Sequence, residues 1–235
     1  MKKIDYSNNY RVLEDKETKF IESLSRWFLL FCVVIAGFIF MVNIVYETAP
    51  VDGPSMQNTL NMYGDNMYDT VVVNIFMKYG NGDIVIIDRS EETGLTREFH
   101  VKRIVGMPGD VIDIVEVNGN YYLERNGEIV QEKYIKSRAG MRRTYEKYLI
   151  LKKNPDFAYC FNGSKFTVPS DYVFVLGDNR AESEDSSING PYKMSSVVGK
   201  VQYVVPYGVS TVGYIVKNIF RLPQETYKLY ENVYI

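Results

Sequence analysis

The sequence has 235 residues, a formal net charge of −2 and 24% charged residues. These values suit one globular domain with an anchor, and without a basic excess they argue against a nucleic-acid partner. There are one histidine and two cysteines, and none of them lies in a cluster with the spacing of metal ligands. We therefore expect no metal and no cofactor. Cys32 lies in an apolar run far from Cys160, so a disulfide between them is not expected.

An uncharged apolar run covers residues 27–46 and reads WFLLFCVVIAGFIFMVNIVY. About 20 such residues span the hydrocarbon core of a bilayer as a helix. The polar segment 1–26 is rich in lysine and arginine, whereas the first basic residue after the run is Lys78. The positive-inside rule therefore predicts a single-pass signal anchor in the cell membrane, with 1–26 cytoplasmic and the rest extracytoplasmic. Its length disfavours a cleaved signal peptide, and its apolar character on all sides disfavours a buried core helix.

Short β-rich runs follow the apolar segment, at 71–76, 83–88, 98–106, 111–117, 172–177 and 198–205. Asn-Gly pairs, which are typical of tight turns, occur at 81–82, 118–119, 126–127, 162–163 and 189–190. We therefore predict a mostly β protein, in which a single N-terminal transmembrane helix precedes an antiparallel β domain. This domain is expected to comprise residues 47–117 and 169–205.

Residues 118–168 are richer in charge and tyrosine and alternate less clearly. A hairpin is expected to turn at Asn126-Gly127 within them. We interpret this stretch as a smaller β subdomain inserted in the main one. The C-terminal segment 206–235 has an apolar run too short for a second span, and the sequence assigns it no role.

The first stretch that could carry chemistry is VDGPSMQNTL, residues 51–60. Gly53 and Pro54 set a sharp local geometry just before Ser55. Such a turn can expose a serine hydroxyl and aim backbone N–H groups at one point, as a nucleophile and its oxyanion require. Taken alone, the stretch favours the alternative, a simple turn with an exposed hydroxyl.

The second stretch is FHVKRIVGMPGD, residues 99–110. Alternate side chains of a strand share a face, so Lys102 and its neighbour Arg103 should point opposite ways. A lysine on an inward face is desolvated, which lowers its pKa and makes it a usable base. The alternative is a solvated lysine on an edge strand.

The third stretch is LGDNRAESEDSS, residues 176–187, where a strand ends and a polar loop follows. Its Asp and Asn side chains are of the kind that hold loops together through bonds to the backbone. Ser183 could reach and orient a neighbouring lysine, and Asp185 could fix the loop. A purely structural loop is the alternative.

Together the three stretches resemble bacterial type I signal peptidases, which are membrane-anchored Ser/Lys endopeptidases. The similarity extends over about residues 27–205. Ser55-Met56, with Thr59-Leu60 following, resembles the nucleophile box of this family. KRIVGMPGD from Lys102 resembles the general-base box, and GDNRAESEDS at 177–186 resembles the third box. Three ordered boxes behind one signal anchor make the resemblance highly specific.

The resemblance implies a role for each matching residue. Ser55 would be the nucleophile, its backbone N–H an oxyanion donor, and Lys102 the general base. Ser183 would hydrogen-bond Lys102 and fix its direction. Residues that would support the site are Gly53, Met56, Arg103, Asp178, Arg180 and Asp185. The resemblance also implies that substrate docks as an added strand, with small residues preferred before the cut.

The sequence departs from the family at two positions. The family usually has proline where this chain has Asn58, which makes the turn after the nucleophile less rigid. It usually has arginine where this chain has Ser187, so Asp185 lacks an expected charge partner. His100, two residues before Lys102, is expected to pack beside the lysine and desolvate it, with a role as the base the alternative.

These observations predict a membrane-bound serine endopeptidase that removes N-terminal signal peptides from exported preproteins. Its expected partners are preproteins emerging from the export machinery and membrane lipid. Two alternatives stay open: a catalytically weak or non-catalytic relative that acts as a membrane-anchored binding or assembly factor, and a processing protease dedicated to one client. The sequence does not indicate the oligomeric state.

Overall fold

The computed structural model describes residues 7–57, 59–61, 67–90, 94, 98–135, 139–211 and 213–214. The chain divides into two compact units, one ending at Val45 and one beginning at Tyr46. The expected C-terminal segment 206–235 is described only as far as Tyr214, and its remainder lies outside the described residues.

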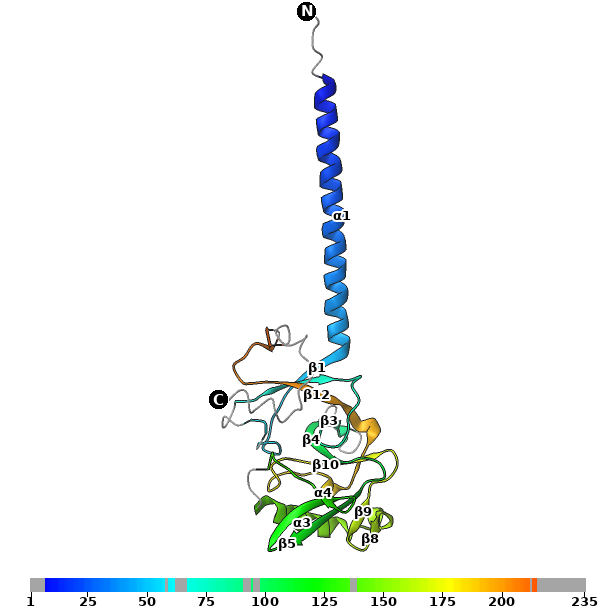
Figure 1. The fold of residues 1–235 in the computed structure, drawn as a ribbon, viewed down its shortest axis with the longest axis vertical. Coiled ribbons are helices and arrows are strands. Elements are labelled where there is room, and N and C mark those ends of the chain that lie inside the picture. The colour runs from blue at the N-terminus through cyan, green and yellow to red at the C-terminus, as the bar shows by residue number, and fades with distance from the viewer. Residues whose placement is uncertain are drawn as a thin grey trace, which may run out of the picture. The chain divides into compact units, whose positions relative to one another are not determined.

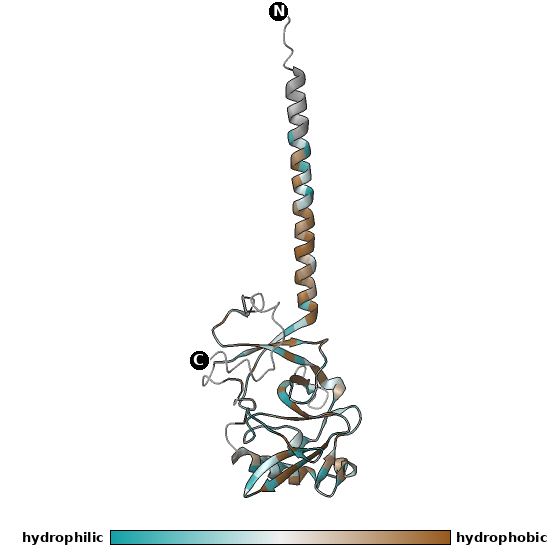
Figure 2. Ribbon diagram, in the orientation of Figure 1, coloured by the Kyte–Doolittle hydropathy of each residue, from teal (hydrophilic) through white to brown (hydrophobic). Residues whose placement is uncertain are grey.

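The first unit is one long helix, α1 (Ser7–Val45). From Glu17 to Val45 it is long and apolar enough to cross a membrane, and it is the one such helix among the described residues. Figure 2 shows the apolar residues concentrated in its C-terminal part. Phe28, Phe31 and Phe38 are each more than half exposed. The helix therefore has an apolar surface that no part of its own unit covers.

The second unit contains a seven-stranded sheet in the order β1-β2-β12-β3-β4-β10-β11. All its strand pairs are antiparallel. The strands are β1 (Tyr46–Pro50), β2 (Thr70–Asn74), β3 (Ile84–Asp88), β4 (Phe99–Gly106), β10 (Tyr172–Leu176), β11 (Tyr192–Lys193) and β12 (Val197–Val205). Strands β2, β3, β4, β10 and β12 lie on β-rich runs of the sequence, whereas β1 and β11 were not expected. The prediction of an apolar N-terminal helix followed by an antiparallel, mostly β region is confirmed.

A second, five-stranded sheet has the order β7-β6-β5-β9-β8. Its strands are β5 (Val111–Val117), β6 (Asn120–Arg125), β7 (Glu128–Ile129), β8 (Phe161–Asn162) and β9 (Lys165–Thr167). Figure 1 shows β5, β8 and β9 grouped with the helix α3 at one end of this unit, while β1 and β12 lie at the other end. The expected hairpin at Asn126-Gly127 is present, between β6 and β7.

The small sheet begins earlier than the sequence suggested. Residues 111–117 were expected in the main β domain, but β5 pairs with β6 and β9. The cause is the turn at Asn118-Gly119, where both residues have positive φ, 53° and 78°. A two-residue turn of this kind forces the strand before it to pair with the strand after it.

The inserted region is not purely β. Helix α3 (Ala139–Leu151) lies within it, followed by the 3₁₀ helix η1 (Pro155–Cys160). The buried residues of α3 include Met141, Thr144, Tyr148 and Leu151, a spacing of three and four that places them on one face. This face packs on β5, β6 and β10 in a core that includes Ile112, Leu123, Phe166 and Phe174.

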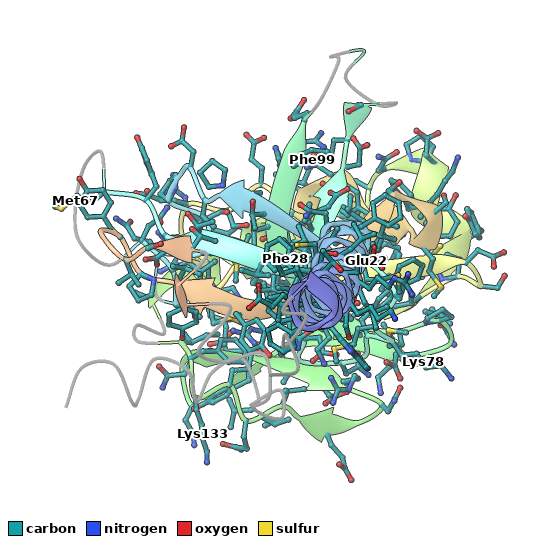
Figure 3. The ribbon with its side chains drawn as sticks, turned by 90° about the horizontal axis from the view of Figure 1, so that it is seen from above. Glu22, Phe28, Met67, Lys78, Phe99 and Lys133 are labelled. Carbon is teal, nitrogen blue, oxygen red and sulfur yellow. The ribbon has the colours of Figure 1, made fainter. Side chains whose placement is uncertain are left out.

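Short elements complete the second unit. Helix α4 (Ser186–Asn189) follows the polar loop after β10, and the 3₁₀ helix η2 (Met194–Ser196) precedes β12. A separate core beneath the large sheet unites Met56, Leu60, Val71 and Ile84. The segment around Ser55 is therefore anchored by buried residues of its own, Met56 and Leu60. The side chains of Lys78 and Lys133 are exposed, and they lie at the periphery of the unit (Figure 3).

Candidate active site

The turn that carries Ser55 follows strand β1. Gly53 has φ of 95°, a conformation that glycine adopts without strain. Beyond it the chain coils tightly, with Met56 O accepting hydrogen bonds from Leu60 N at 2.7 Å and Thr59 N at 2.8 Å. The side chain of Met56 is buried. The turn thus places Ser55 between a glycine with positive φ and a methionine with a buried side chain.

Lys102 lies on β4, between β3 and β10, and meets Ser55 directly. Its Nζ donates a hydrogen bond of 2.9 Å to Ser55 Oγ. The residue is only 3% exposed, so the ammonium has lost most of its hydration. The structure therefore brings into contact two residues that lie far apart in the sequence, and this contact is the one that a serine nucleophile and its base require.

Burial is the main reason that the pKa of Lys102 is lowered to about 8. Nearby cations, Arg89 and Lys147, lower this pKa further, whereas the carboxylates of Asp185 and Glu184 raise it. With a pKa of about 8, roughly a tenth of the lysine is neutral at pH 7, compared with well under a thousandth for a free lysine. The side chain can therefore accept a proton near neutral pH.

Arg103 points away from Lys102 and is fully buried. Its Nε and Nη2 donate to the two carboxylate oxygens of Asp178, at 2.8 and 2.6 Å. Its Nη1 donates to Gly82 O at 2.7 Å, and its guanidinium lies 3.9 Å from the ring centre of Tyr134. A bidentate pair of this kind fixes both partners strongly. Asp178 also accepts a hydrogen bond from Thr59 Oγ1, so it connects β4 to the turn that carries Ser55.

Asn179, the residue after Asp178, also binds the turn that carries Ser55. The backbone N–H of Asn179 donates to Ser55 O at 2.9 Å. Its side-chain Nδ2 donates to Pro54 O at 3.0 Å. The loop after β10 and the turn after β1 are therefore joined at Ser55 and Pro54. Asn179 was not singled out in the sequence, although it lies within the third box.

Ser183 does not make the hydrogen bond expected of it. The side chain is fully buried, and its Oγ has no hydrogen-bond partner among the described residues. Lys102 directs its ammonium to Ser55 instead. Ser183 Oγ lies against Gly177, because a Cβ at Gly177 would fall 2.2 Å from this oxygen and 2.5 Å from Ser55 O. The hydroxyl therefore lies near the backbone of Ser55.

Asp185 organises the end of the polar loop. Its Oδ2 accepts a hydrogen bond of 3.0 Å from Gly177 N. Its Oδ1 accepts from Ser187 N at 3.1 Å and from Ser187 Oγ at 2.7 Å, which caps α4. Where an arginine was expected, Ser187 therefore supplies two neutral donors. The other departure, Asn58, lies outside the described residues.

Arg180 belongs to the loop, and its buried side chain is bound by Glu132 of the inserted region. Its Nη1 donates to Glu132 Oε2 at 3.0 Å, and its Nη2 pairs with Oε1 of the same carboxylate. Its Nε donates to Gly177 O at 3.0 Å. Tyr134 OH in turn donates to Glu132 at 2.8 Å. Glu132 and Tyr134 were missed in the sequence, since they lie in a segment that had been assigned only a structural role.

His100 pairs with Glu98 and not with Ser55. Its Nε2 lies 3.0 Å from Glu98 Oε1, and its Nδ1 has no hydrogen-bond partner among the described residues. Burial lowers the pKa of His100, and the positive charges of Lys102 and Arg89 lower it further. Lys102, not His100, makes the contact with Ser55. The part of the chain that the structure describes holds no group of His, Cys, Asp or Glu suited to a metal, and Cys32 and Cys160 are free thiols.

Comparison with known proteins points to one family. The family described as "Signal peptidase, peptidase S26" matches residues 24–206. A "Signal peptidase I" of Bacillus caldolyticus is 34% identical over 177 residues, 75% of this chain and 86% of the relative. A "Signal peptidase I P" of Bacillus subtilis subsp. natto is 28% identical over 192 residues, 81% of this chain and 93% of the relative. A crystal structure of a signal peptidase I from Enterococcus faecalis V583 is 26% identical and covers 53% of this chain and 97% of its own, with a TM-score of 0.36.

Proposed function

Because this chain belongs to the signal peptidase family, peptidase S26, whose members are serine endopeptidases, we propose that Ser55 and Lys102 are its catalytic dyad. The observation that carries the proposal is the 2.9 Å hydrogen bond from Lys102 Nζ to Ser55 Oγ. The burial of the lysine adds support, since it lowers the pKa to about 8. A nucleophile in contact with a base of suitable pKa is the arrangement that acyl transfer needs.

The reaction proceeds in two halves. Neutral Lys102 takes the proton of the Ser55 hydroxyl while Oγ attacks the carbonyl carbon of the scissile peptide bond. Lys102 then gives this proton to the leaving amine as the C–N bond breaks, which leaves an ester on Ser55. Water, deprotonated by the same lysine, attacks the ester, and the serine recovers its proton as the N-terminal fragment departs with a new free carboxylate.

The oxyanion formed in each half is stabilised by backbone donors. Ser55 N–H is the donor implied by the position of the nucleophile, because Gly53 offers no side-chain hydroxyl. The positive φ of Gly53 and the hydrogen bonds of Asn179 to the turn support a fixed orientation of this backbone. A preorganised donor of this kind contributes on the order of 3 kcal/mol to transition-state stabilisation.

The substrate binds as an added strand along β4. β3 pairs with β4 at Phe99–Arg103, whereas β10 pairs only with Arg103, Ile104 and Gly106. The second edge of β4 from Phe99 to Lys102 therefore has no partner strand among the described residues, and Phe99 lies toward the outside of the unit (Figure 3). An extended peptide on this edge would bring its scissile bond to Ser55, next to Lys102.

The substrates are exported preproteins, from which the enzyme removes the N-terminal signal peptide, with small residues preferred before the cut. The apolar helix of the chain is its membrane anchor. Basic residues precede this span, which supports a cytoplasmic N-terminus and a catalytic domain on the outer side. The enzyme would thus meet preproteins as they emerge from the export machinery.

The full-length protein in lipid vesicles or detergent should cut a preprotein at its signal-peptide junction. Ser55→Ala and Lys102→Met should each abolish cleavage, and an acylating serine-directed inhibitor should label the wild type but not Ser55→Ala. Matched exposed changes, Ser195→Ala and Lys78→Met, should leave the rate unchanged. Cleavage by Ser55→Ala at the wild-type rate would refute the assignment of the nucleophile. If the wild type cuts none of a range of preproteins, the proposed activity is refuted.

A further inference from the structure

Lys147 is a charged side chain near the site to which the reaction as proposed assigns no step. It belongs to α3, in the inserted region, and is partly buried. Its Nζ donates a hydrogen bond of 2.6 Å to the backbone carbonyl of Ser183. This contact is charge-assisted, and such bonds are shorter and stronger than neutral ones.

The contact is part of a continuous seam between α3 and the polar loop. A Cβ at Gly140 would fall 2.9 Å from Ala181 N, so the two backbones are in close contact. Thr144 Oγ1 donates to Arg180 O at 3.4 Å. Gly140, Thr144 and Lys147 are spaced four and three residues apart, which places them on one face of the helix. This face therefore follows the loop from Arg180 to Ser183.

Ser183, the residue that Lys147 binds, lies near the backbone of Ser55. Ser183 is fully buried and its Oγ has no hydrogen-bond partner among the described residues, so no hydrogen bond of its own side chain fixes its place. Its hydroxyl and Ser55 O both lie within 2.5 Å of the position that a Cβ at Gly177 would take. A shift of Ser183 would therefore be transmitted at once to the backbone at Ser55.

We propose that Lys147 is a positioning residue of the Ser55/Lys102 dyad, which fixes the loop at Ser183 and places a second cation near Lys102. The inference rests on the proposed function. Through Lys147, the inserted region would contribute to catalysis in addition to packing on the main sheet. A like charge favours the neutral form of the general base, and a fixed loop keeps the dyad in its reactive geometry.

The charged and titratable groups around Lys102 come from several elements. Arg89 follows β3, His100 precedes the lysine on β4, Glu184 and Asp185 belong to the loop, and Lys147 belongs to α3. The two carboxylates favour the ammonium form, whereas Arg89 and Lys147 oppose it. Loss of Lys147 leaves the carboxylates less opposed, so the pKa of Lys102 should rise and the acidic limb of the activity profile should move to higher pH.

Preprotein cleavage by Lys147→Met, Lys147→Gln, Lys147→Arg and the wild type, measured from pH 6 to 10, tests the inference. Arg143→Met is the matched control, because Arg143 is an exposed cation on the same helix. We expect Lys147→Met to lower kcat at pH 7 about three- to tenfold and to move the acidic limb upward by half a unit to about one unit. KM should change less than twofold, Arg143→Met should match the wild type, and Lys147→Arg should restore most of the activity.

Each outcome is decisive. Wild-type kcat and an unmoved acidic limb in Lys147→Met would overturn the proposal, as would a lower melting temperature with an unmoved limb, since that is the mark of a structural role alone. If Lys147→Met does not fold, Lys147→Gln decides by the same two readouts, because it keeps a donor and loses the charge. Absence of cleavage by the wild type would instead refute the proposed function, so the two failures are distinguished.

Discussion

The backbone N–H of Asn179 donates a hydrogen bond of 2.9 Å to the carbonyl of Ser55. This contact joins the loop after β10 to the nucleophile turn after β1, and the side chain of Asn179 adds a second bond to Pro54 O. The orientation of the Ser55 backbone, and hence of its N–H, is thus set from a part of the chain far away in sequence. Asp178, which directly precedes Asn179, forms a buried ion pair with Arg103.

Replacement of Asn179 by alanine should lower kcat. The backbone bond to Ser55 remains, but the bond to Pro54 is lost, and a single neutral hydrogen bond contributes about 1 kcal/mol. We expect a decrease in kcat of about threefold to tenfold with little change in KM. Steady-state cleavage of a preprotein measures it, with the exposed Asn162→Ala as control. Equal kcat in both variants would show that the side chain of Asn179 does not position the turn.

Gly177→Ala should inactivate the enzyme. The added Cβ would fall 2.2 Å from Ser183 Oγ and 2.5 Å from Ser55 O, and the second of these neighbours is backbone that can move only with the nucleophile. Overpacking of this kind costs about 1–3 kcal/mol. Gly80→Ala is the control, since a Cβ there meets nothing within 4 Å. Cleavage rates and melting temperatures should fall for the first variant only, and a fully active Gly177→Ala would contradict the geometry.

Arg103→Ala should destabilise the second unit strongly. It leaves the buried carboxylate of Asp178 without its bidentate partner, and the removal of one partner of a buried pair costs about 3–5 kcal/mol. The exposed pair of Arg142 and Glu146 on α3 is the comparison, where Arg142→Ala should cost under about 1 kcal/mol. Urea unfolding measures both. Similar midpoints for the two variants would show that the buried pair contributes nothing of its own.

Lys102 should make the enzyme less stable at neutral pH than it would otherwise be. Its pKa is about 8 in the folded protein and 10.5 as an ordinary value. Between these values the unfolded chain binds more protons, so the free energy of unfolding should rise with pH from about 8 to about 10.5. Below this window the whole penalty, about 3 kcal/mol, opposes folding. Lys102→Met should therefore be more stable at pH 7 and lose this rise, which thermal unfolding across pH would detect.

The strands could be predicted from the sequence because period-two burial and Asn-Gly turns are local signals. Ser55, Lys102 and the polar loop could be found because three ordered motifs lie behind an apolar run. The helix α3 was missed although Met141, Thr144, Tyr148 and Leu151 have helical spacing, because the surrounding charge and tyrosine content suggested a β subdomain. The partners Glu132 of Arg180 and Lys147 of Ser183 depend on how the inserted region packs on the loop, and no local pattern encodes that contact.

The pH dependence of preprotein cleavage tests the Ser55/Lys102 assignment most directly. We expect kcat/KM of the full-length enzyme in lipid to rise through an apparent pKa near 8, the value given by the burial of Lys102, and to be about a hundredfold lower at pH 6 than on the plateau. His100→Ala should keep this limb. A rate that does not change between pH 6 and 9, or a limb near the pKa of histidine that disappears in His100→Ala, would show that Lys102 is not the general base.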